Sequence, residues 1–250
     1  MRPTLMTIAL FALLITCSGC EHKSKATGTA YYFIFDQSIG SVVVRHRIED
    51  TFSALVNDAE PGDIIAGVGA NEDTERNAVA GFIETMPLYA FMTDSEQKYK
   101  IELAATKQRL QGHVTALLQI EATGTDLLGG FILAGKFFSN TPARACGRRV
   151  LVVFTDGVQQ SRDCDFTVTS TLQDNGVNTI IERERQLKRL PDLSTVEVHF
   201  VGVKLAVSEQ ADMTSEKMGL VQDFWTSYCA AASTKLNPAY YGPMWSATTH

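Results

Sequence analysis

Residues 31–36 read YYFIFD, a run of five apolar side chains that ends at an aspartate. A second stretch, VLVVFTDG at residues 150–157, has the same form. Continuous apolar runs of this length are typical of strands buried on both faces, as in the middle of a parallel sheet. Open α/β sheets bind their ligands at the carboxyl ends of such strands. We therefore expect Asp36 and Asp156 to meet at that edge.

The rest of the chain alternates predicted strands with predicted helices. Apolar residues recur at near-helical spacing over residues 41–59, and Pro61-Gly62-Asp63 then turns the chain into an apolar strand at 64–68. Further strands are expected at 81–86, an edge strand that stops before Pro87, and at 195–203, and further helices at about 95–122, 125–138, 179–190 and from 215. This order predicts an α/β fold with a doubly wound, mostly parallel central sheet and helices on both faces.

Hydroxyl groups accompany the two aspartates. Ser38 follows Asp36 by two residues, and Thr125 stands at the predicted start of a helix after Gly124. Carboxylate and hydroxyl oxygens suit a hard dication such as Mg²⁺ or Mn²⁺. Two aspartates would neutralise the ion, and neutral hydroxyls would leave it able to accept a carboxylate from a partner protein.

These residues resemble a known family. Asp36-x-Ser38, Gly124-Thr125-Asp126 and Thr155-Asp156-Gly157 stand in the order and spacing of the von Willebrand factor A domain and its metal-ion-dependent adhesion site. The turn at 61–63 and the helix residues Phe224-Trp225-x-x-Tyr228 are similar to bacterial members of that family.

The resemblance implies a Rossmann-like domain over residues 30–236, followed by a tail at 237–250. It also implies one Mg²⁺ or Mn²⁺ surrounded by Asp36, Ser38, Thr125 and Asp156, and an adhesion or scaffold function in which a partner protein offers an Asp or Glu carboxylate.

The sequence departs from the family's pattern at Gly40, where a hydroxyl is usual and Ser41 follows one residue later. Either Ser41 is a further ligand, or water takes that place. Simpler roles are also open: Asp36, Ser38 and Thr125 are common helix caps, and Asp156 is a common turn residue.

The N-terminus has the form of an export signal. Arg2 precedes an apolar stretch at 5–15, of signal-peptide length, and Ser18-Gly19-Cys20 resembles a bacterial lipoprotein processing site. Residues 1–19 would then be a signal peptide, Cys20 the lipidated residue and 20–29 a tether in the cell envelope. By resemblance to Gram-negative sorting rules, Glu21 favours the outer membrane. An ordinary signal peptide or a short membrane anchor are the alternatives.

Other function classes fit less well. The net charge of −6 and the absence of a Lys/Arg cluster argue against nucleic acid as a partner. A phosphohydrolase of the haloacid dehalogenase type could use Asp36 and Lys204, but Ser38 stands where a general acid is needed. We therefore expect no enzyme. A structural lipoprotein with a degenerate metal site is the third alternative.

Two minor expectations concern single residues. His199 falls in a predicted buried strand and is expected to be a core residue with its polar atoms paired. Cys146, Cys164 and Cys229 are an odd number in a compartment that permits disulfides, and no essential disulfide is expected among them.

Overall fold

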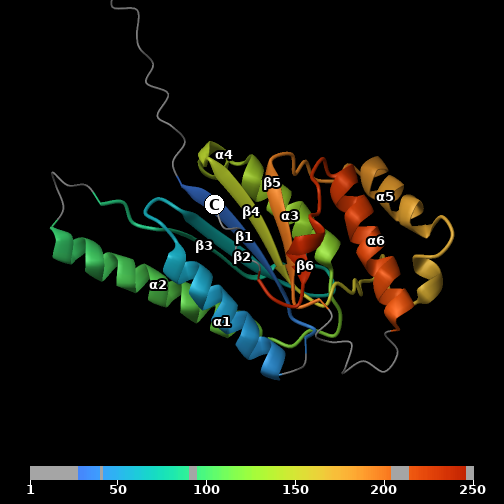
Figure 1. Cartoon of the computed structure of the whole chain (residues 1–250), viewed down its shortest axis with the longest axis horizontal. Coiled ribbons are helices and arrows are strands. Elements are labelled where there is room, and N and C mark those ends of the chain that lie inside the picture. Colours follow the sequence, from blue (N-terminus) through green and yellow to red (C-terminus); the bar gives the residue numbers. More distant parts are fainter. Residues whose placement is uncertain (1–27, 40–41, 90–94, 204–213, 246–250) are drawn as a thin grey trace, which may run out of the picture.

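The structure is a computed structural model that describes residues 28–39, 42–89, 95–203 and 214–245. Within these residues a six-stranded sheet has the order β3-β2-β1-β4-β5-β6 (Figure 1). The strands are β1 (Thr29–Asp36), β2 (Ile64–Ala70), β3 (Val79–Thr85), β4 (Arg148–Phe154), β5 (Val196–Val201) and β6 (Tyr241–Gly242). Every neighbouring pair is parallel except β2 and β3. The predicted α/β fold is confirmed, and the edge strand expected at 81–86 is β3, which runs antiparallel to β2.

Helices cover both faces of the sheet. The helices are α1 (Val42–Asp58), α2 (Glu96–Leu118), α3 (Leu127–Ser139), α4 (Thr141–Ala145), α5 (Gly176–Gln186) and α6 (Ser215–Ala231), with short 3-10 turns η1 (Thr169–Thr171) and η3 (Pro238–Tyr240). Helices α1 and α2 form one layer, and α3, α5 and α6 contribute to the core on the other face. No helix among the described residues combines the length and apolarity needed to cross a membrane.

Strand β1 shows why the apolar run at 31–35 must be central. Successive side chains of a strand point to opposite faces. Phe33 and Phe35 accordingly enter the core under α1 and α2, while Tyr32 and Ile34 enter the core under α3. Both cores take an apolar residue at each step, so the run cannot lie at an edge of the sheet.

The C-terminal tail is part of the sheet, which the sequence left open. Turn η3 leads into β6, and β6 pairs in parallel with β5 through Phe200–Tyr241 and Val201–Gly242. The ring of Tyr240 stacks on His199 at 4.0 Å between centroids, and Trp245 lies 4.4 Å from the same ring. Residues 238–245 therefore cover an edge of the sheet that would otherwise end at β5.

Strands β1 and β4 end at the same level. Their register pairs Phe35 with Phe154, and the two rings stack at 5.2 Å. Asp36 and Thr155 are the next residues on each strand, so they lie side by side at the carboxyl edge. The chain enters β1 at the opposite, amino edge.

Candidate metal centre

Asp36 is the centre of a cluster of hydroxyl groups. Its Oδ1 accepts hydrogen bonds from Ser38 Oγ at 2.7 Å, from the Ser38 amide at 3.0 Å and from Thr125 Oγ1 at 2.7 Å. Its Oδ2 accepts from Thr155 Oγ1 at 2.7 Å. Asp36 and Thr125 are buried, whereas Ser38 is exposed. The cluster is therefore anchored by buried residues and is open to solvent at Ser38.

Backbone pairing places Thr125 beside Asp36. The Thr125 amide donates to the Gln160 carbonyl at 2.7 Å, and the Gln160 amide donates back at 2.8 Å. A Cβ at Gly124 would lie 2.5 Å from the Gln160 carbonyl oxygen, so only glycine allows this close approach. The glycine of the GTD motif thus allows the backbone to come close enough for Thr125 to take its position.

The helix cap after Thr125 is Asp126. Asp126 Oδ1 accepts from the Gly129 amide at 2.9 Å, and its Oδ2 accepts from the Thr74 amide at 3.2 Å. Burial raises the pKa of Asp126, and these hydrogen bonds oppose the shift. The simpler interpretation of Thr125 as the helix cap is therefore wrong, because the neighbouring residue has that role and the Thr125 hydroxyl is left for Asp36.

The second acid lies at the same edge. Asp156 follows Thr155 directly, is 8% exposed, and accepts from the Val158 amide on Oδ1 at 2.8 Å. Burial, and secondarily the Asp156 carboxylate, raise the pKa of Tyr241 in β6. The tail therefore reaches the surroundings of the predicted site.

The oxygens around Asp36 fit a small dication. Asp36 Oδ1, Ser38 Oγ and Thr125 Oγ1 form a triangle whose three sides are each 2.7 Å. An octahedral Mg²⁺ with ligands at 2.0–2.1 Å has neighbouring oxygens about 3.0 Å apart. The triangle thus matches one face of such an octahedron after an expansion of a few tenths of an ångström.

The electrostatics of Asp36 favour a cation nearby. Burial raises the pKa of its carboxyl above the usual range, and the hydroxyls of Thr125, Thr155 and Ser38 act against that rise. A positive charge beside a buried carboxylate offsets the cost of removing it from water.

The predicted ligands are brought together to different extents. Asp36, Ser38 and Thr125 are in direct contact, and Asp156 stands at the same strand ends. Ser41 and Gly40 lie outside the described residues, as do Cys20 and Lys204. The part of the chain that the structure describes holds no group of three or more His, Cys, Asp or Glu side chains suited to a metal. A centre here would depend on hydroxyl ligands.

Sequence reasoning missed two residues of the site. The TDG motif by itself indicates no role for Thr155, although its place beside Asp36 follows once strands β1 and β4 are aligned. Gln159 Oε1 accepts from the amides of Leu127 and Leu128 at 2.7 and 3.2 Å, and its Nε2 donates to Asp126 at 3.1 Å. It ties the loop after β4 to the start of α3, and no local sequence signal indicates this.

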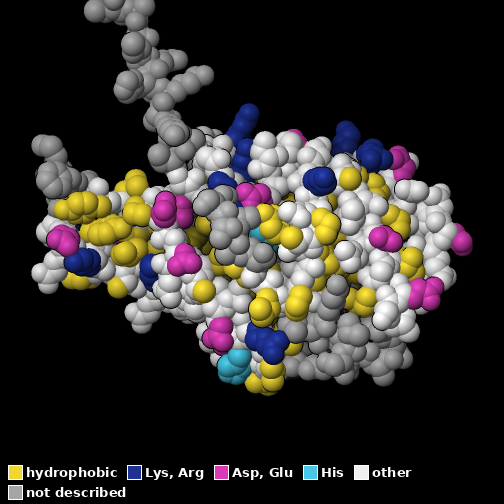
Figure 2. Space-filling model, viewed as in Figure 1, with side chains coloured by type: hydrophobic (Ala, Val, Ile, Leu, Met, Phe, Trp, Pro, Cys, Tyr) yellow, Lys and Arg dark blue, Asp and Glu magenta, His cyan; other side chains and the backbone are white. Residues whose placement is uncertain are grey.

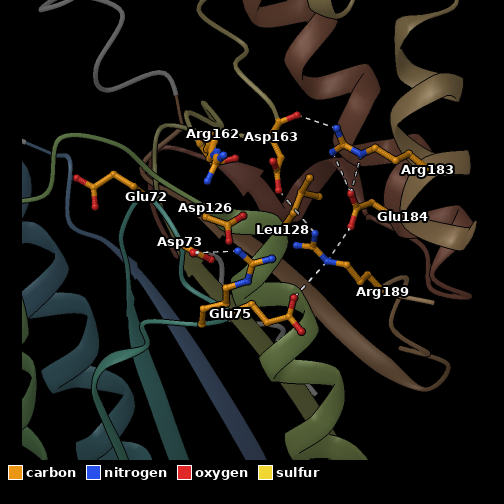
Figure 3. A pocket seen from close by; sticks show the side chains of 12 residues that line it. Glu72, Asp73, Glu75, Asp126, Leu128, Arg162, Asp163, Arg183, Glu184 and Arg189 are labelled. Atoms are coloured by element: carbon orange, nitrogen blue, oxygen red, sulfur yellow. Dashed lines mark hydrogen bonds and ion pairs between the residues drawn. The ribbon is translucent and has the colours of Figure 1, made fainter. Parts of the chain in front are cut away.

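A charged cavity of about 310 Å³ lies next to the site, beyond Asp126 (Figure 3). Its walls carry ion pairs. Glu184, only 1% exposed, accepts from Arg183 at 2.9 Å, and Arg189 lies between Glu184 at 3.4 Å and Glu75 at 3.2 Å. The acidic and basic side chains of the wall neutralise one another in these pairs. Through Arg189, the pairs connect Glu184 in α5 to Glu75 in the loop after β2.

No protein-family model matches the chain, and no curated protein matches it. Among solved structures it is similar to the pilus adhesin SpaC from Lactobacillus rhamnosus GG in an open conformation, with 14% identity over 88% of this chain and a TM-score of 0.46. It is also similar to a von Willebrand factor type A protein from Catenulispora acidiphila, with 13% identity over 82% of this chain and a TM-score of 0.32. The chain spans 28% and 43% of the length of these two proteins. Similarity at this level assigns neither a family nor an activity.

Proposed function

We propose that this chain is a von Willebrand factor A-like binding domain of the bacterial cell envelope, which engages a partner protein through one Mg²⁺ or Mn²⁺. The ion would be held by Asp36, Ser38, Thr125 and Asp156, with Ser41 or water completing the set. The single observation that carries the proposal is the triangle of oxygens around the buried Asp36 carboxylate, open to solvent at Ser38.

Each residue has a distinct part in the proposal. Asp36 and Asp156 supply two negative charges, and Ser38 and Thr125 supply neutral oxygens. Thr155 is a positioning residue, because its hydroxyl donates to Asp36 Oδ2 and leaves Oδ1 as one corner of the triangle. When bound, the ion offers a positive site to a carboxylate of the partner. The partner is therefore proposed to contribute an Asp or Glu.

The proposal includes attachment to the membrane through a lipid on Cys20, with the outer membrane favoured by Glu21. The tether enters at the amino edge of the sheet, and the candidate metal centre lies at the carboxyl edge. The binding edge would thus be directed away from the membrane.

The first experiment is a calorimetric titration of Mn²⁺ into the chain from Lys23 onward. We expect one-to-one binding that Asp156→Ala abolishes and Thr125→Val weakens. Thr123→Val is the matched control, because the Thr123 hydroxyl belongs to the same loop but donates to Glu72 instead of Asp36. Thr155→Val should weaken binding by about 10–100-fold, as loss of a group that orients a ligand commonly does.

Two competing functions give different results. If the folded wild type takes up no Mn²⁺, with or without acetate as a stand-in for the partner's carboxylate, the metal proposal fails and a structural lipoprotein is favoured. Phosphatase turnover that is lost in Asp36→Asn would instead favour the phosphohydrolase. EDTA-insensitive capture of an identified partner would contradict a metal-mediated contact.

A further inference from the structure

The amino edge of the sheet brings the start of the domain next to the end of β3. The Thr29 amide donates to Asp63 Oδ1 at 2.6 Å, and the Gly62 amide donates to the Met86 carbonyl at 3.0 Å. A Cβ at Gly62 would lie 3.0 Å from the side chain of Leu88. The chain that enters the domain at Gly28 therefore does so close to Leu88.

An exposed apolar surface lies at this edge. We call it the basal patch and define it as Leu88, Tyr89 and Tyr99. The exposed Ile101 stands in the same turn of α2 as Tyr99, on another side of the helix. Leu88 is 69%, Tyr89 41% and Ile101 64% exposed, and the rings of Tyr89 and Tyr99 lie 5.3 Å apart. Figure 2 shows apolar side chains gathered at the left of the molecule, over the N-terminal part of α2 and the end of β3.

The N-terminal part of α2 covers little of the core, and meets it through the partly buried Leu103. The fully buried residues of this helix begin at Thr106 and continue to Leu118. Its first ten residues, 96–105, include none of them, and this part extends past α1 in Figure 1. Single exposed apolar residues are ordinary on a protein surface, but a group of them on an overhanging helix indicates a contact with something else.

The chain before Gly28 indicates what that contact is. It contains the apolar stretch at 5–15 and the predicted lipid acceptor Cys20. The eight steps from Cys20 to Gly28 span at most about 28 Å when fully extended. Whether Cys20 is lipidated or the apolar stretch is retained, the amino edge is held within reach of the bilayer.

The chemistry of the patch suits the headgroup region of a bilayer. Tyrosine and aliphatic side chains are enriched at membrane interfaces, where apolar and polar surroundings meet. The neighbouring charges on α2 are balanced, with Glu96 and Glu102 against Lys98 and Lys100, and Lys100 pairs with Glu96 at 2.6 Å. Contact should therefore depend little on anionic lipid.

We propose that the basal patch lies in the headgroup region of the membrane that anchors the chain. The domain then rests on its amino edge, and the carboxyl edge with Asp36 faces away. This inference depends on the anchoring part of the proposed function and is independent of the metal centre.

The test uses the full chain, reconstituted into phosphatidylcholine vesicles with brominated acyl chains, which quench a bimane label at the membrane. The label is attached at Ile101→Cys, which is exposed in the same turn of α2 as the patch residue Tyr99. The matched control is Val43→Cys, since Val43 is 62% exposed in the first turn of α1 at the carboxyl edge. The unsubstituted chain gives the background from the native thiols. We expect several-fold stronger quenching at 101 than at 43, and a loss of that difference when Leu88 and Tyr89 are both changed to Ser.

Three outcomes would overturn the inference. If quenching is weak and equal at both positions while the chain floats with the vesicles, the chain is anchored but the basal patch does not contact the membrane. If the chain does not float with the vesicles, the proposed membrane anchor is contradicted as well. A label at 101 that is shielded from iodide but not quenched by bromolipid, with shielding that fades as protein is diluted in lipid, indicates a second copy of the chain on the patch. The Mn²⁺ titration is unaffected by any of these, so failure of the metal proposal is seen separately.

Discussion

The buried hydroxyl of Thr155 makes two hydrogen bonds at the candidate metal centre. It donates to Asp36 Oδ2 at 2.7 Å and accepts from the Gly157 amide at 3.0 Å, and it is fully buried. Thr155→Val keeps the shape of the side chain but leaves a carboxylate oxygen and an amide without that partner. We expect a loss of about 1–3 kcal/mol in the free energy of unfolding, measured by urea denaturation without metal.

The control for Thr155 is Thr167→Val. The Thr167 hydroxyl also bonds an aspartate, Asp165 at 2.6 Å, but the residue is exposed. Its loss should cost little, because water replaces the bond. If the two variants lost the same free energy of unfolding, burial of the hydroxyl would not determine how much stability its removal costs.

At the scale of an element, the tail that forms η3 and β6 is sensitive to acid through His199. This ring is 1% exposed and stacks with Tyr240 and Trp245, and neither of its nitrogens has a hydrogen-bond partner among the described residues. The expectation of a core histidine with paired polar atoms is therefore half right. Burial lowers the pKa of His199 to about 4, although Glu197, with Oε2 at 3.6 Å, acts in the other direction.

The sign of the pH effect follows from this lowered pKa. An unfolded histidine has a pKa near 6.5, so between pH 6.5 and 4 the unfolded chain binds the proton and the folded chain does not. The contribution to stability is complete above pH 6.5 and is lost as the pH falls, by about 2 kcal/mol between pH 7 and 5.

Urea denaturation of the wild type and of His199→Phe at pH 7 and 5 checks this prediction. The variant keeps a ring for Tyr240 and Trp245 to stack on, and it should lose less stability on acidification. Identical pH dependence in the two proteins would show that His199 is not the group responsible.

At the scale of the whole molecule, the residues that the structure describes are packed together without a disulfide. Cys146, Cys164 and Cys229 are free and buried. Burial raises the pKa of Cys164 and Cys229 to about 12, so both remain thiols at neutral pH and react slowly. The expectation of no essential disulfide among them stays a prediction.

The matching measurement is thermal unfolding with and without reductant. We expect the same Tm in both, because no cross-link among the three thiols constrains the unfolded chain. Alkylation should be slow at these thiols in the folded protein and fast in urea. A clear fall in Tm with reductant would indicate a bridge that the structure does not contain.

The layered α/β fold can be predicted from local patterns in the sequence. Apolar runs at 31–35 and 150–154 can be buried only in the middle of a sheet, and the helical spacing of residues such as Phe52 and Phe224 places helices on its faces. These are local patterns, and local patterns survive in a single sequence. The acids and hydroxyls that the motifs bring to one sheet edge were predictable for the same reason.

Which of these groups are in contact depends on the three-dimensional packing of the chain. Thr155 bonds Asp36 because the register of β1 and β4 pairs Phe35 with Phe154, and Asp126 caps α3 so that Thr125 is left for the cluster. The tail has no periodic pattern, yet Tyr241 joins the sheet because β5 offers an unpaired edge. Register, capping and edge pairing depend on residues far apart in the chain, so their geometry is settled by packing and by hydrogen bonding across the fold.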